Sequence, residues 1–188
     1  MKKVFTVASA QSNIDWIGRK VTGSHYGTID IKEGSLIVND GKLTSGSFVV
    51  DTTSIRILDV TDPATNAQFA GHLASADFFA SEQFPEAVFV IRSVDQKENK
   101  SYNIDGDLTI RGITHPVSFD ATISIAGDNL TAIGKIVVDR TRYEMKFRSG
   151  NFFKDLGDVL IYNEFDLMVS ITAKANANES FAAMPEHK

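Results

Sequence analysis

The sequence predicts an all-β protein, a single antiparallel β-barrel of about eight strands with one short helix. Apolar and polar residues alternate without a break over 117–125, and the same period of two recurs over 102–110 and near 161–172. This period is typical of strands that have one buried and one solvated face. Short polar breaks such as Asn39-Asp40-Gly41-Lys42 separate the runs and predict hairpin turns.

Strands are expected at roughly 12–21, 26–38, 43–52, 86–95, 101–111, 115–126, 130–139 and 159–173. Consecutive antiparallel strands leave two exposed edges unless the sheet closes on itself, so a closed barrel is expected. A barrel of this size either fills with side chains or keeps a cavity for one small ligand.

One segment departs from the strand pattern. Asp62 followed by Pro63 is a typical helix start, with an N-cap and a proline at the first helical position. Phe69 and Leu73 then fall on one face of a short helix over about 63–74. We expect this helix to cover one end or flank of the barrel.

The domain organisation is simple. Residues 1–174 are expected to form one domain, and 175–188 a poorly ordered tail. Lys2 and Lys3, a short apolar run and Ala8-Ser9-Ala10 resemble a signal peptide, but only about four apolar residues stand where an export signal needs roughly 7–15. A cytoplasmic location is therefore expected, or a periplasmic one if a leader has been removed. No stretch approaches the ~18 apolar residues of an integral membrane segment.

Composition and motifs argue against several classes of function. A formal charge of −5 is unfavourable for binding nucleic acid. The chain has no cysteine, and its histidines (His25, His72, His115, His187) show no metal-ligand spacing. It has neither a G-x-S-x-G motif nor a phosphate-binding G-K-[ST] loop. We therefore expect no catalytic residue, no metal site and no cofactor.

Apolar side chains are the remaining feature. Thirteen phenylalanines, four tyrosines and one tryptophan are a large aromatic content for one barrel. From composition alone, a filled core and a hollow barrel are equally consistent with this content.

Several motifs resemble the YceI-like family of lipid- and polyisoprenoid-binding proteins. The similar segments are 16–27 with 50–55, 72–79 with 84–89, 104–117, and Asp139-Arg140-Thr141 with Tyr143. Together they span the chain from about residue 5 to 173. The resemblance implies an extended lipocalin-like barrel that is hollow and takes a prenyl chain, a fatty amide or a similar molecule.

On this basis we expect non-enzymatic binding, sequestration or transport of a long apolar ligand, of the polyisoprenoid, isoprenoid quinone or fatty-acyl type. The alternation of the strands predicts the apolar lining, which comprises Trp16, Phe89, Ile104, Leu108, Phe119, Ile123, Phe165 and Leu167. Candidates for contact with a polar head group come from the opening hairpin and the Asp139-Arg140-Thr141 element, and are Lys20, His25, Tyr26, Arg140 and Arg142. If Asp139 points outward, Arg140 points inward, where a charge needs a partner.

Two alternatives remain. The barrel could be an enzyme acting on such a lipid, with Arg140 or His25 as polar catalysts at its mouth. It could instead have a filled core and bind a protein on its outer face. A homodimer is left open.

Overall fold

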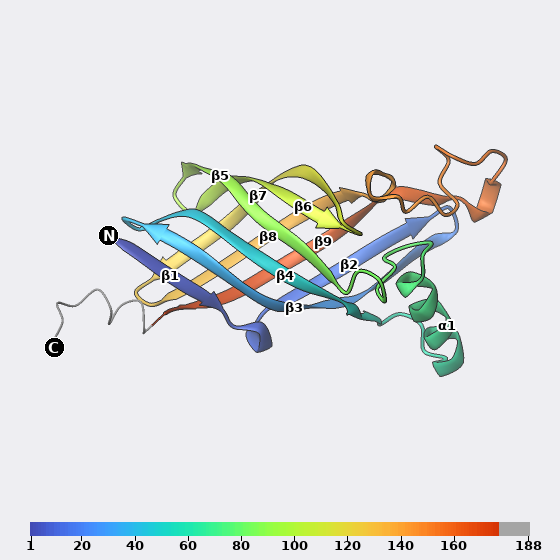
Figure 1. Ribbon diagram of the computed structural model, residues 1–188, viewed down its shortest axis with the longest axis horizontal. Helices are drawn as coiled ribbons and strands as arrows, with labels where there is room; N and C mark the ends of the chain where they lie inside the picture. The colour runs from blue at the N-terminus through green and yellow to red at the C-terminus, as the bar shows by residue number, and fades with distance from the viewer. Residues whose placement is uncertain (177–188) are drawn as a thin grey trace.

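The computed structural model describes residues 1–176, which form nine strands, one α-helix and three short 3₁₀ helices (Figure 1). The strands are β1 (Lys2–Val7), β2 (Asn13–Lys20), β3 (Gly23–Asn39), β4 (Lys42–Ile57), β5 (Glu86–Glu98), β6 (Ser101–Ile110), β7 (Ile113–Ala126), β8 (Asn129–Asp139) and β9 (Ile161–Ala175). The helix is α1 (Pro63–Ala74), and the 3₁₀ helices are η1 (Ser9–Gln11), η2 (Arg140–Tyr143) and η3 (Gly157–Val159).

The sheet closes into an elongated antiparallel barrel, as the sequence predicts. The strands follow the order β3-β2-β9-β8-β7-β6-β5-β4, and β4 pairs with β3 to complete the circle. The turn between β3 and β4 shows why these hairpins form. Asp40 and Gly41 have φ angles of 51° and 81°, the positive values that a type I′ turn requires at both central residues.

Strand β1 is absent from the prediction and is the main correction to it. It pairs with β3 over Lys2–Thr6 and with β9 over Phe5–Val7, whereas β2 pairs with other parts of the same two strands. Strands β1 and β2 therefore share one position in an eight-position barrel, with η1 between them. The apolar run that resembles a short signal sequence is in fact a strand that buries Phe5 completely.

The C-terminal end of the domain is anchored by the same region. Ala175 is the last residue of β9, and the backbone N–H of Asn176 donates to the Val4 carbonyl oxygen at 2.7 Å. The rest of the predicted tail, 177–188, lies outside the described residues.

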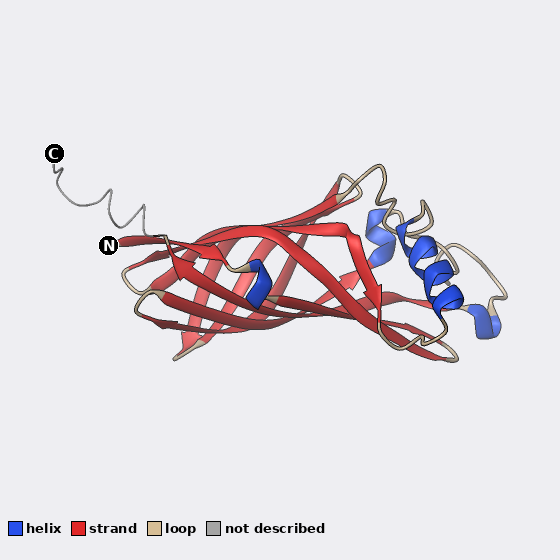
Figure 2. Cartoon of the chain, turned by 90° about the horizontal axis from the view of Figure 1, so that it is seen from below, coloured by secondary structure: helices blue, strands red, loops and turns tan. Residues whose placement is uncertain are grey.

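Helix α1 has the predicted bounds and lies across one end of the barrel (Figure 2). It packs against β4. Asp62 is the N-cap, and its carboxylate accepts a hydrogen bond from the Thr65 backbone N–H at 2.9 Å and from the Thr65 hydroxyl at 2.6 Å. No helix among the residues that the structure describes is long and apolar enough to cross a membrane.

The Asp62 cap gives a stability prediction with a defined pH dependence. The two hydrogen bonds from Thr65 hold the pKa of Asp62 below its ordinary value of 3.8. A lowered pKa means that the carboxylate stabilises the fold above pH 3.8 and that this contribution is lost as the pH falls through the folded-state pKa. Asp62→Ala should therefore lower the melting temperature at pH 7, and the difference should shrink below pH 3.8. Calorimetry at both pH values measures this, and equal melting temperatures at pH 7 would contradict the capping role.

The interior differs between the two ends of the barrel. At the end away from α1 the lumen is filled by side chains that are almost completely buried, including Phe5, Leu36, Val38, Tyr102 and Leu130. At the α1 end several inward-facing side chains, such as Trp16 and Phe165, are only partly buried. The barrel is thus filled at one end and hollow at the other.

Candidate functional site

A cavity of about 780 Å³ occupies the α1 end of the barrel. Its walls are inward-facing side chains of β2, β3, β4, β5, β6 and β9. The deepest of these are aliphatic or small, namely Ile14, Ile29, Val50, Ala87, Leu108 and Leu167. Each belongs to a strand in which every second residue faces inward, so the alternation in the sequence produces a continuous apolar wall.

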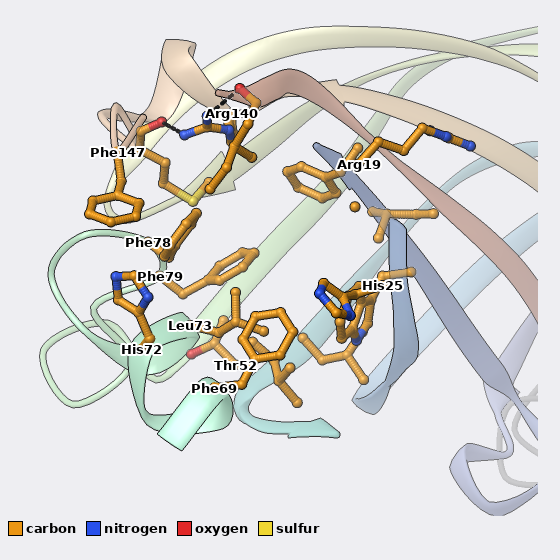
Figure 3. Close-up of a pocket in the computed structure, with 18 of the residues that line it drawn as sticks. Arg19, His25, Thr52, Phe69, His72, Leu73, Phe78, Phe79, Arg140 and Phe147 are labelled. Atoms are coloured by element: carbon orange, nitrogen blue, oxygen red, sulfur yellow. Dashed lines mark hydrogen bonds between the residues drawn. The ribbon is translucent and has the colours of Figure 1, made fainter. Parts of the chain in front are cut away.

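Helix α1 and the turn that follows it form the roof of the cavity. Phe69 and Leu73 of α1, with Phe78 and Phe79 beyond it, point between the helix and the strands (Figure 3). The ring of Phe79 lies 6.2 Å from that of Phe165 on β9, in an edge-to-face arrangement. The roof is thus held to the walls by aromatic contacts, which depend on shape and on exclusion of water.

A second group of roof residues comes from the long segment between η2 and β9. Phe147 packs edge-on against Phe78, with ring centroids 5.8 Å apart, and against His72 at 4.6 Å. Met145 lies beside them and is 1% exposed. Segments far apart in the sequence therefore meet over the mouth of the barrel.

Arg140 is a buried cation at the edge of this cavity, with only 3% of the residue exposed. Its Nε donates to the Tyr162 carbonyl at 3.0 Å, Nη1 to the Met145 carbonyl at 2.6 Å and Nη2 to the Ile161 carbonyl at 2.9 Å (Figure 3). Burial lowers the pKa of Arg140 to about 10, although the charge of Asp139 opposes this change.

The partners of Arg140 are notable because all three are backbone oxygens. Among the residues that the structure describes, no carboxylate forms an ion pair with it. Three of the five N–H groups of the guanidinium are used by the carbonyls. The result is a desolvated positive charge on the cavity wall that Asp139 stabilises at a distance but that no carboxylate of the described residues contacts directly.

Two histidine–aspartate pairs stand at the rim. His25 of β3 lies 2.8 Å from the Asp59 carboxylate, and His72 of α1 lies 2.9 Å from that of Asp77. Burial opposes the ionisation of Asp59, yet hydrogen bonds from the Tyr26 backbone N–H and from His25 lower its pKa. His25 also packs edge-on against Phe69 at 4.8 Å. The His25–Asp59 pair joins β3 to the segment before α1, and the His72–Asp77 pair joins α1 to the turn that follows it.

The structure places the predicted lining residues in two groups. Trp16, Leu108, Phe165 and Leu167 line the cavity. The other four do not line the cavity and pack in the core instead. Phe89, Ile104 and Ile123 are buried there, and Phe119 is partly buried. Their inward orientation follows the alternation, but they lie further along the barrel than the cavity extends.

The predicted head-group candidates also divide. Lys20, His25 and Arg140 line the cavity. Tyr26 is 50% exposed and Arg142 contacts His115 at 3.2 Å, and neither lines it. Arg140 was expected to meet either a head group or an acidic partner. Its hydrogen bonds within the described residues go to backbone carbonyls, and contact with a head group stays a prediction.

The sequence predicted one part of the roof. The expectation that the helix carrying Phe69 and Leu73 covers one end or flank of the barrel is confirmed, whereas the part that comes from the segment between η2 and β9 was not predicted. Phe147 lies in a segment without regular periodicity. Among the described residues, no group of three histidine, aspartate or glutamate side chains could hold a metal ion.

A family model for the YceI-like domain matches residues 5–173, which confirms the resemblance of the motifs. Protein YceI of Escherichia coli O157:H7 is 29% identical over 148 residues, covering 78% of this chain and 72% of the relative. The UPF0312 protein plu2095 of Photorhabdus laumondii is 32% identical over 154 residues, covering 78% and 71%.

Solved structures show the same fold at low sequence identity. BcnA of Burkholderia cenocepacia matches with a TM-score of 0.68 and 20% identity, over 89% of this chain and 99% of that one. A domain from Saccharophagus degradans, described as polyisoprenoid-binding and implicated in plant cell wall breakdown, matches with a TM-score of 0.66 and 9% identity, over 92% and 98%. The extended barrel predicted from the sequence is therefore confirmed.

Proposed function

We propose a binding function for this chain, which belongs to the YceI-like family. It binds one long apolar molecule in its cavity and carries or sequesters that molecule without converting it. The observation on which this proposal rests is the cavity itself. Its volume of about 780 Å³ lies in the range of ligand sites, and its walls and roof are mostly aliphatic and aromatic.

The physics of such a site favours chain-like ligands. Each methylene group that leaves water contributes about 0.8 kcal/mol, so a long chain binds well without any hydrogen bond. An apolar wall makes no directional demands, and it therefore selects for the length and girth of the chain. Polyisoprenoids, isoprenoid quinones and fatty-acyl chains share these properties. The Saccharophagus degradans domain, described as polyisoprenoid-binding, supports the first of these classes.

The polar end of the ligand is proposed to lie at Arg140. Burying a charge is costly, and burial lowers the pKa of this guanidinium to about 10 even though the charge of Asp139 opposes this change. A carboxylate, phosphate or carbonyl oxygen on the ligand would meet the N–H groups that the backbone carbonyls do not occupy. His25 and Lys20 stand at the rim of the same cavity, where a head group would also meet water.

The experiment that tests this proposal uses the purified protein before and after removal of lipid. Native mass spectrometry should show one bound molecule per chain, and extraction should release an apolar compound with a long chain. The delipidated protein should bind a fluorescent fatty acid saturably, and geranylgeraniol should displace it. Absence of both a mass shift and a saturable signal would contradict the proposal.

A further inference from the structure

Three phenylalanine rings lie directly beyond the inner end of the cavity. Val50 of β4 and Ala87 of β5 belong to its deepest wall, and the next inward-facing residues on these strands are Phe48 and Phe89. Phe119 of β7 is the third ring. The centroids of Phe48 and Phe89 are 6.3 Å apart, and those of Phe89 and Phe119 are 5.7 Å apart. None of the three lines the cavity.

The backbone is shaped to hold these rings. Each lies against a glycine on a neighbouring strand, Phe48 against Gly34 and Phe89 against Gly106. A β-carbon at Gly34 would come within 2.8 Å of the Phe48 ring, and one at Gly106 would overlap the Phe89 ring. Phe119 lies against the third glycine, Gly134, where a β-carbon would come within 3.3 Å of its ring. The missing side chains leave the space that the rings fill, as close packing requires.

The lumen beyond the rings is filled. Leu36 is 2% exposed, Ile123 is 2% exposed and Leu130 is fully buried. A ligand chain that enters from the α1 end would therefore meet the three rings before it could reach the far end of the barrel.

From these observations we infer that Phe48, Phe89 and Phe119 form a floor that sets the maximum length of the ligand chain. The inference rests on the proposed function and adds a specificity determinant to it. Affinity rises with each methylene until the chain touches the floor, and it stops rising when further carbons must remain outside or bend. The side chains that set this limit are the rings, and Ala87 sets how closely the chain approaches them.

The test is a series of straight-chain fatty acids from decanoate to docosanoate, titrated into the delipidated protein. For the parent protein, affinity should rise about fourfold per methylene and then reach a plateau. Phe89→Ala should move the plateau to chains about two to four carbons longer, the space that the ring vacates. Ala87→Leu adds bulk at the floor and should move the plateau to shorter chains.

A matched control is Phe5→Ala, the same change at a fully buried ring in the far end of the barrel. It should leave the plateau where it is. If Phe89→Ala does not fold, Phe89→Leu and Ala87→Leu still test the inference in opposite directions. An unchanged plateau in folded variants that bind would overturn the floor. Absence of binding to the parent protein would instead overturn the proposed function, and the role of the floor with it.

Discussion

Replacing Gly18 by phenylalanine should weaken ligand binding at least tenfold while leaving the barrel folded. Gly18 lies on β2 and lines the cavity, and a β-carbon at this position would have no atom within 4 Å. A phenyl ring can therefore enter the cavity without displacing the backbone. Phenylalanine also favours strand conformation more than glycine does. We expect at least a tenfold loss of affinity for a fluorescent fatty acid, and loss of the co-purifying molecule in native mass spectra.

Gly71→Phe is the matched control for this variant. Gly71 lies on the exposed side of α1, does not line the cavity, and also has no atom within 4 Å of the position of a β-carbon. The same substitution there should leave the affinity unchanged. Both variants should melt near the temperature of the parent protein. If they then bind the fluorescent fatty acid with equal affinity, the cavity is not the binding site.

The sequence indicates which way a residue faces more reliably than how deep it lies. Alternation correctly places Leu108 and Ile104 on the same inner face of β6, but only Leu108 lines the cavity. Depth depends on the tilt and stagger of all strands around the barrel, which arise from long-range register and not from any single strand. The boundary between hollow and filled lumen is therefore a property of the closed sheet.

Strand β1 and the part of the roof that comes from the segment between η2 and β9 were not predicted, for separate physical reasons. Val4–Val7 is too short to show a clear period of two, and the flanking lysines and alanines match another pattern. Phe147 and Met145 lie in a segment whose backbone accepts hydrogen bonds from residues far away in the sequence, such as that from Arg111 to the Glu144 carbonyl. No local pattern encodes such a contact, although the parity of β8 did indicate that Arg140 turns inward.

Arg140→Met should have the largest effect on stability. The variant keeps apolar bulk but leaves the carbonyls of Met145, Ile161 and Tyr162 without their donor. An unpaired buried polar group costs about 1–3 kcal/mol, so the free energy of unfolding should fall by about 3 kcal/mol or more. For a chain of this size the melting temperature should fall by roughly 6–12 °C. Thermal and urea unfolding measure both quantities.

A test of the head-group role of Arg140 needs a measurement that does not change merely because the variant is less stable. The parent protein should bind palmitate more tightly than hexadecanol, because only the acid offers a charge to the guanidinium. The measurement is made at a temperature where both variants are folded. Arg140→Lys keeps a positive charge and should retain part of this preference. Arg140→Met should bind both compounds with equal affinity. A ratio of affinities that is the same in the parent and in Arg140→Met would show that Arg140 only holds the segment between η2 and β9 in place, and that the head group lies elsewhere at the rim.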